Sequence, residues 1–297
     1  MSDFFSRRHP FVNLFYFTMV VAFIIILKHP LYLCCSLFIG IIYSLFLGCR
    51  QEIKKIFICI PIFLFLGALN PFVSHWGETV LFLFFSKPFT LEALLYGMNM
   101  SLMFFTILVW FVCYGKIMTY DKFTYLFEPI APSVSLMLVM VLKLVPTFSK
   151  KYKEVSEARK GIGLVNGDSL KSKIQYSKSI FSVLFLRILE DSVYAVDSME
   201  FRSYGKSKRS SYNTYKFCGL DLFLIVFFIV MSFLIIFGVF MDYVYINFYP
   251  TITVSVPNNS FGLVNFLSYI LFTIFPIFYE LVLYLKWKFV INRISKV

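Results

Sequence analysis

The sequence predicts an all-α polytopic membrane protein, and its composition is the first reason. Of its residues 59% are hydrophobic, 39 are Phe, only 15% are charged, and the mean hydropathy is +0.79. These values lie outside the range of soluble globular domains. No hydrophilic run exceeds about 70 residues, which leaves no room for a separate catalytic domain of roughly 100 to 150 residues. The function therefore belongs to the membrane part and its loops.

The placement of basic residues is the second reason. The net charge is +12, and Lys and Arg occur in short clusters between apolar segments. Such clusters mark the cytoplasmic loops of membrane proteins and attract anionic lipid, so nucleic acid is not an expected partner. Arg7 and Arg8, the cluster at 50–55 and the basic C-terminus at 286–296 therefore define the cytoplasmic side.

Six apolar segments are the third reason, because each is close to the roughly 20 residues that cross a bilayer. Both termini are expected in the cytoplasm. Lys28-His29-Pro30 stands where a signal peptide would have a cleavage site, so the first span is expected to be retained. The stretches 70–88 and 242–261 are expected to be outer loops, and re-entry of 80–85 into the bilayer is left open. The six segments are 11–27, 31–49, 56–69 with an extension to 73, 91–114, 217–241 and 262–285.

The segment 134–148 is apolar but is predicted to lie at the cytoplasmic interface. Its 15 residues would cover only about 22 Å of a hydrocarbon core about 30 Å thick. It also contains Lys143 and Pro146. If it crossed the membrane, the strongly basic stretch 150–216 would lie outside, against the positive-inside rule.

The stretch 150–216 is the long hydrophilic insertion of the chain. It is predicted to hold a helix at 150–160, breakers at Gly161, Gly163 and 166–168, and an amphipathic helix at 179–200. Arg187 is placed to pair with Glu190 and Asp191 at the i+3 and i+4 positions. The predicted organisation is four transmembrane helices in 1–133, cytoplasmic and interfacial helices in 134–216, and two transmembrane helices in 217–297.

No catalytic, cofactor-binding or metal site is predicted, and the chain is not expected to be an enzyme. No phosphate-binding loop ending in Gly-Lys-Ser/Thr is present, and His9, His29 and His75 are isolated from one another. The six cysteines lack CxxC spacing and are interpreted as packing residues. Glu92 and Glu280, the carboxylates at span ends, are interpreted as interfacial.

Two arginine motifs in the insertion are the candidate site. Ala158-Arg159-Lys160 precedes Gly161, and Phe201-Arg202-Ser203 precedes Gly205, so both arginines are expected at helix ends. A guanidinium offers a planar fork to a carboxylate, with a geometry that lysine lacks. Two such ends can engage two copies of a partner or two grooves of a dimer.

With these motifs the sequence resembles the transmembrane T component of energy-coupling factor transporters, the family that also includes cobalt-transport permeases. The resemblance covers most of 1–209. It is carried by the two arginine motifs, by His9-Pro10 and Leu144-Val145-Pro146, and by the stretches 70–82, 90–97 and 119–126.

The resemblance implies two long coupling helices that cross in the insertion between the fourth and fifth spans. Each would end in an Ala-Arg-Gly-like motif that docks into one of two cytoplasmic ABC ATPases. The implied docking residues are Ala158, Arg159, Lys160, Phe201, Arg202 and Ser203. The sequence departs from the family pattern at Lys160 and Ser203, where Gly is usual, and at Phe201, where a small residue is usual.

The implied role is that of a scaffold in the plasma membrane of a prokaryote-type cell. ATP-driven motion would pass through the coupling helices to a separate substrate-binding membrane subunit that takes up a vitamin or a metal ion. One alternative is a self-contained membrane enzyme acting on lipids, with the basic insertion as its headgroup site. Another is a channel or secondary carrier, although no internal repeat is present.

Overall fold

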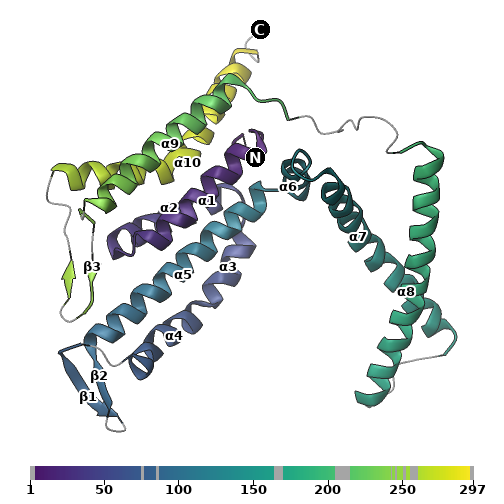
Figure 1. Cartoon of the computed structure of the whole chain (residues 1–297), viewed down its shortest axis with the longest axis horizontal. Coiled ribbons are helices and arrows are strands. Elements are labelled where there is room, and N and C mark those ends of the chain that lie inside the picture. Colours follow the sequence, from purple (N-terminus) through teal and green to yellow (C-terminus); the bar gives the residue numbers. More distant parts are fainter. Residues whose placement is uncertain are drawn as a thin grey trace. The chain divides into compact units, whose positions relative to one another are not determined.

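The computed structural model describes residues 4–74, 77–84, 87–163, 170–204, 215–241, 243–244, 246–249, 252–254 and 260–294, without the side chains of 82–88, 254 and 289–294. Contacts divide the chain into two units, shown in Figure 1. The first joins Met1–Thr119 with Tyr215–Val297, and the second is Tyr120–Thr214. The apolar helices from both ends of the chain thus form one unit, and the second unit begins before residue 134.

The first unit contains most of the apolar helices and two short hairpins. Its helices are α1 (Pro10–Ile26), α2 (Pro30–Phe46), α3 (Arg50–Ile58), α4 (Ile60–Val73), α5 (Leu91–Ile117), α9 (Gly219–Phe240) and α10 (Ser260–Ile294). Its hairpins pair β1 (Val80–Phe84) with β2 (Lys87–Thr90), and β3 (Ile246–Asn247) with β4 (Thr253–Val254).

The first two helices begin with the same His-Pro device. His9 and His29 are the N-caps, and each accepts a backbone N–H through Nδ1, from Phe11 and Leu31 respectively, at 3.3 Å. Proline follows at the first helical position, where its missing N–H costs nothing and its fixed φ suits a helix. The paired His-Pro residues therefore set where both helices start.

Aromatic side chains form the core of this unit. Tyr16 of α1 is fully buried, with its ring centroid 5.2 Å from that of Phe228 and 5.3 Å from that of Phe272. Trp110 of α5 is also fully buried, and its Nε1 donates to Ser36 Oγ at 2.9 Å. These contacts pack α1, α2, α5, α9 and α10 together.

Two glycines permit close helix contacts at other points of the unit. In α5, a Cβ on Gly97 would collide with the carbonyl oxygen of Gly67 and with Cβ of Asn70, both in α4. In α9, a Cβ on Gly238 would collide with Asn265 of α10. Both pairs of helices therefore approach at positions where only a hydrogen atom fits.

Asn265, which packs against Gly238, connects three helices by hydrogen bonds. Its Nδ2 donates to the carbonyl oxygens of Leu234 and Ile235 at 3.1 Å, and its Oδ1 accepts from the hydroxyl of Tyr32 at 3.2 Å. Asn265 is only 3% exposed. Its polar atoms are paired in an apolar setting, which stabilises the α2, α9 and α10 arrangement.

Apolar helices support the predicted class of all-α polytopic membrane protein. Five helical stretches within the described residues are long and apolar enough to cross a bilayer, and α1 and α2 are apolar helices of 17 residues each. The five stretches are Arg50–Val73, Leu91–Ile117, Pro132–Gly161, Gly219–Phe240 and Ser260–Lys288.

The structure corrects the sequence interpretation around the third segment. The helix begins at Arg50, so the basic cluster forms its first turns as α3, and a turn at Cys59 separates it from α4. Residues 70–73 continue α4, as the expected extension of the third segment to 73 predicts, and Asn70 Nδ2 donates to the carbonyl oxygen of Ala93 at 2.8 Å. The next stretch forms the β1–β2 hairpin. The contact of Asn70 with Ala93 joins residues 23 positions apart, which a local pattern does not report.

The second unit consists of α6 (Tyr120–Phe127), α7 (Pro132–Gly161) and α8 (Leu170–Phe201). The expected division into 134–148 and 150–160 is wrong, because α7 runs unbroken through Pro146 for 30 residues. The hydroxyls of Thr147 and Ser149 donate to the carbonyl oxygens of Lys143 and Val145, at 3.0 and 3.2 Å. The segment 134–148 is therefore part of a helix long enough to cross a bilayer, whereas the positive-inside rule still predicts a cytoplasmic position for the basic stretch that follows it.

Candidate partner-docking site

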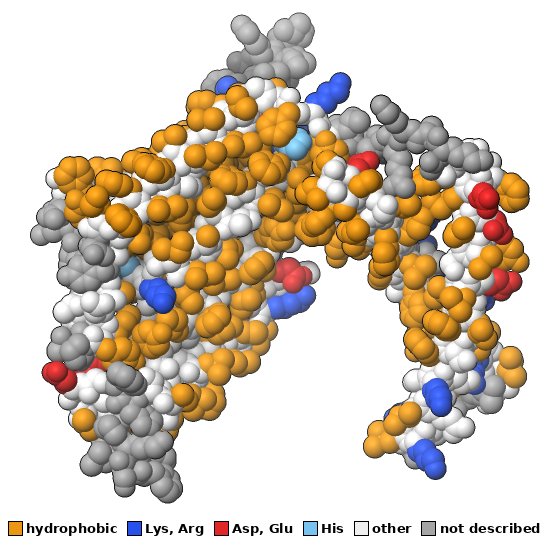
Figure 2. All heavy atoms as spheres, in the orientation of Figure 1, with side chains coloured by type: hydrophobic (Ala, Val, Ile, Leu, Met, Phe, Trp, Pro, Cys, Tyr) orange, Lys and Arg blue, Asp and Glu red, His pale blue; other side chains and the backbone are white. Residues whose placement is uncertain are grey.

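Helices α7 and α8 cross in the second unit (Figure 1), and a small apolar cluster joins them. Val155, Ile180 and Leu184 are buried there, and Phe148 and Tyr176 pack against them. Ser156 Oγ lies 3.4 Å from the Tyr176 hydroxyl, within hydrogen-bond distance. Figure 2 shows apolar and charged side chains over the visible face of this unit. The two helices are thus joined over a few turns.

An ion pair also joins the helices at the crossing. Lys151 of α7 pairs with Asp191 of α8. The sequence placed Asp191 with Arg187 instead, because i and i+4 neighbours are the only partners that a single helix reveals. The structure shows that this carboxylate connects two helices.

The first arginine motif lies in the last turn of α7. The N–H of Ile162 donates to the carbonyl oxygen of Ala158 at 3.2 Å, and that of Gly163 to Lys160 at 3.1 Å. Gly163 has φ +81°, the left-handed conformation that ends many helices. Ala158 and Lys160 are exposed, and Arg159 is half-buried. The expected helix breakers at 166–168 lie outside the described residues.

Tyr176 of α8 orders the side chain of Arg159. The guanidinium carbon lies 5.2 Å from the centre of the tyrosine ring, a cation–π contact. Arg159 Nη1 is shielded from solvent and has no hydrogen-bond partner within the described part of the chain. The sequence carries no local signal for Tyr176, because its contact with Arg159 depends on the helix crossing. The guanidinium is therefore held in position by Tyr176 and can still donate a hydrogen bond from Nη1 to a partner.

The second arginine motif forms a complete Schellman cap at the end of α8. The N–H of Tyr204 donates to the carbonyl oxygen of Met199 at 3.0 Å, and that of Ser203 to Glu200 at 2.9 Å. Ser203 has φ +56°, which glycine adopts more readily. This geometry gives a physical reason for glycine being favoured at such a position. Phe201 is 89% exposed, and Arg202 is exposed beside it.

The two arginines therefore occupy different positions relative to their helix ends. The residue with a left-handed backbone conformation, Gly163 in one motif and Ser203 in the other, comes four positions after Arg159 and one position after Arg202. Arg159 lies on the body of α7 against Tyr176, whereas Arg202 is at the tip of α8 next to an exposed aromatic side chain. Both are near helix C-termini, where the helix dipole favours cations.

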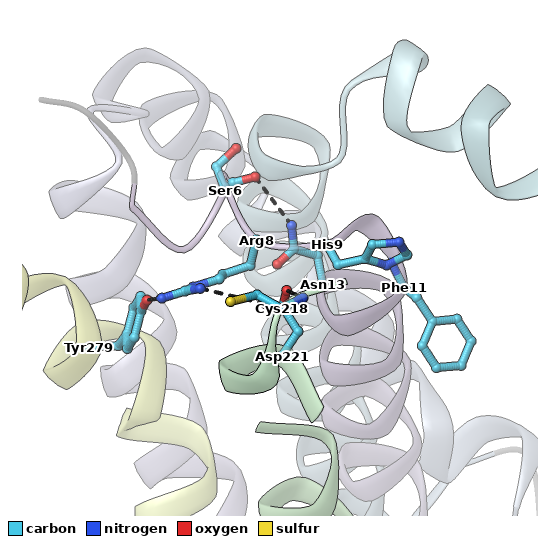
Figure 3. A network of polar contacts seen from close by, with 8 residues as sticks. All are labelled: Ser6, Arg8, His9, Phe11, Asn13, Cys218, Asp221 and Tyr279. Carbon is cyan, nitrogen blue, oxygen red and sulfur yellow. Dashed lines mark hydrogen bonds and ion pairs between the residues drawn. The ribbon is translucent and has the colours of Figure 1, made fainter. Parts of the chain in front are cut away.

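A separate polar network joins α1, α9 and α10 in the first unit (Figure 3). Arg8 Nε donates to the hydroxyl of Tyr279 at 2.6 Å, and Arg8 Nη1 lies 3.8 Å from Asp221 Oδ1. Asp221 Oδ2 accepts the N–H of Cys218 at 3.0 Å, capping α9. The sequence identified Arg8 only as a cytoplasmic charge. Its contacts instead stabilise the packing of three helices. The acidic residue Asp221 in the first turn of an otherwise apolar helix is the sequence feature that could have indicated a basic partner for it.

Glu92, possible metal sites and His75 are the remaining candidates for functional chemistry. Glu92 is buried, and its Oε1 accepts the N–H of Thr79 at 3.1 Å, which attaches the β1–β2 segment to α5. No group of three or more His, Cys, Asp and Glu side chains that could hold a metal occurs within the described residues. His75 lies outside those residues.

No protein-family model and no curated protein matches this sequence.

Proposed function

We propose that this chain is the transmembrane scaffold subunit of an ATP-driven importer of the energy-coupling factor type. The observation that carries the proposal is the pair of long helices α7 and α8, which cross at a small cluster and each present an arginine near the C-terminus. The apolar helices of the first unit suit a membrane setting. The scaffold itself would have no catalytic role.

Each helix end would dock into one of two cytoplasmic ABC ATPases. At α8, Phe201 and Arg202 combine an exposed aromatic ring with a guanidinium, the residue types enriched at the energetic centres of protein interfaces. At α7, the ring of Tyr176 holds the Arg159 guanidinium in place, which reduces the entropy lost on binding. Carboxylates in the ATPase grooves would complete both sites.

Force would then pass from the ATPases to a membrane partner. ATP binding and hydrolysis bring the ATPases together and apart, and α7 and α8 move with them. The membrane helices would transmit this motion to a separate substrate-binding subunit for a vitamin or a metal ion. The proposed location is the plasma membrane.

Charge reversal at the exposed tip tests the docking role. The full chain is purified from its host membranes with and without Arg202→Glu, and ATPases that purify with it are quantified. We expect a loss of about tenfold or more, since truncating a buried interfacial charge pair costs roughly 2–5 kcal/mol. Arg187→Glu is the matched control, because Arg187 is an exposed arginine of the same helix away from its end.

A second variant tests the different setting of Arg159. Arg159→Lys keeps the charge but loses the planar group over Tyr176, so ATPase recovery is expected to fall although net charge is unchanged. Full ATPase recovery with Arg202→Glu would contradict the proposal. Hydrolysis of phospholipid by the purified chain alone would favour the membrane-enzyme alternative instead.

A further inference from the structure

An apolar pocket in the first unit has the dimensions of an acyl-chain site. Its volume is about 620 Å³, and α2, α3, α4, α5 and the β3–β4 segment line it. This volume lies within the roughly 300–1,000 Å³ typical of small-molecule sites. Its wall on α5 runs from Leu95 to Phe105. At 1.5 Å per residue this is about 15 Å, or roughly half of a hydrocarbon core about 30 Å thick.

The far end of the pocket is lined by aromatic rings. The centroids of Phe57 and Phe105 lie 5.9 Å apart in an edge-to-face arrangement, and those of Phe63 and Phe105 lie 6.2 Å apart. All three rings line the pocket. From Asn99 to Phe105 is six residues of α5, so a chain entering at Asn99 would meet apolar surface over about 9 Å before it reaches these rings.

The opposite end is polar and adjoins a second, smaller cavity of about 210 Å³. Asn99, Ile246 and Phe248 line both cavities, and Lys28 and Tyr96 line the smaller one. The Lys28 residue is exposed in the turn between α1 and α2. A cation and a tyrosine at this level are typical of the boundary between hydrocarbon and headgroups.

Asn99 has an unused acceptor at the junction of the two cavities. Its Nδ2 donates to the carbonyl oxygen of Lys28 at 2.7 Å, which fixes the orientation of the amide because a carbonyl only accepts. Its Oδ1 is buried without a hydrogen-bond partner in the described part of the chain, and the residue is only 8% exposed. A buried acceptor of this kind calls for a donor from a ligand.

We propose that these two cavities bind one anionic membrane lipid, with an acyl chain in the larger cavity and a phosphate at Lys28. A hydroxyl of the headgroup donates to Asn99 Oδ1. An acyl chain, a phosphate and a headgroup hydroxyl of phosphatidylglycerol supply the apolar group, the anion and the donor that the larger cavity, Lys28 and Asn99 Oδ1 can bind. The site lies wholly within the first unit and is independent of the arginine helix ends.

Lipid titration tests the headgroup. The delipidated full chain in detergent is titrated with palmitoyl-oleoyl phosphatidylglycerol or the phosphatidylcholine with the same chains, and bound lipid is counted by native mass spectrometry. The phosphatidylglycerol is expected to bind about fivefold more tightly, the effect of one basic residue on an anionic headgroup. Lys28→Gln is expected to reduce this preference to the part that the headgroup hydroxyl contributes at Asn99, while Lys54→Gln, at an exposed lysine of α3, is expected to keep it in full.

A pocket-filling substitution tests the acyl-chain site. Leu64 lines the larger cavity and is 46% exposed, so Leu64→Trp can fill the cavity from its outer wall with little disturbance of the core. It is expected to reduce binding of both lipids, whereas Leu66→Trp, on the same helix but outside the lining, is expected to leave binding unchanged.

Three results would overturn the proposal. The first is equal affinity of the native chain for the two lipids, and the second is equal binding by the Leu64→Trp and Leu66→Trp variants. The third is capture of a protein, with no lipid, by a photocrosslinking residue placed at position 64 in cells.

Discussion

The contact between α4 and α5 predicts opposite effects for alanine at two glycines of one helix. Gly97 faces the backbone of α4, where an added Cβ would overlap Gly67 and Asn70. Gly115, also in α5, has open space at the same position. Alanine favours a helix over glycine by about 1 kcal/mol at both sites. Only at Gly97 does packing oppose that preference.

The size of the difference follows from the geometry. Neither the Gly67 carbonyl oxygen nor Asn70 Cβ is the end of a flexible side chain, so Gly97→Ala requires α4 and α5 to separate. Overpacking of this kind costs roughly 1–3 kcal/mol, which exceeds the gain in helix propensity. Gly115→Ala is expected to stabilise by about 0.5–1 kcal/mol. Because the gain in helix propensity is common to both variants, their stabilities should differ by the packing cost alone, about 1–3 kcal/mol, with Gly97→Ala the less stable.

Thermal unfolding of the two purified variants in one detergent measures this difference. The expected order of midpoint temperature is Gly115→Ala, then the native chain, then Gly97→Ala. A midpoint for Gly97→Ala at or above that of the native chain would show that α4 and α5 do not make this close contact, and would refute the packing argument.

Three further predictions concern other contacts. Asn265→Leu removes hydrogen bonds between three helices, each worth about 0.6 kcal/mol in membranes, and should lower stability in thermal unfolding by about 1–2 kcal/mol. At the helix crossing, Lys151→Asp or Asp191→Lys alone should increase hydrogen exchange near the α7–α8 cluster, and the double variant should restore protection. Partial burial lowers the pKa of His9 below 6.5, against the opposing effect of Asp221. The unfolded chain therefore binds more protons as the pH falls through 6.5, so stability should decrease with acidification, and His9→Gln should reduce that dependence.

The apolar helices of the first unit could be predicted because hydrophobic runs and His-Pro starts are local signals. The predicted segments 11–27 and 31–49 correspond to α1 and α2, and 91–114 lies within α5. The β1–β2 hairpin was missed because the sequence between its strands is Phe-Ser, without the Asn-Gly or Gly signal of a tight turn, and because Pro88 argues against a strand. Proline also misled the interpretation, since α7 tolerates Pro146 within a continuous helix.

The arginine positions could be predicted as helix ends from the glycines that follow them. The sequence treated Arg159 and Arg202 as equivalent, and the structure separates them. The contact of Arg159 with Tyr176 requires the crossing of two helices, which no spacing along one helix reveals. The left-handed conformation of Ser203 was hidden because serine rarely adopts it.

The small crossing cluster has a mechanical consequence for the tip of α8. Leu184 is the last residue of α8 buried at the crossing, and the helix continues to Phe201. Beyond the cluster, the Lys151–Asp191 ion pair also joins α8 to α7. The part of α8 from Leu184 to its end is about 25 Å long at 1.5 Å per residue, so a pivot of about 10° at the cluster, with that ion pair opened, displaces Arg202 by about 4 Å. A small change of angle at the α7–α8 cluster thus moves the tip of α8 by more than the length of a hydrogen bond.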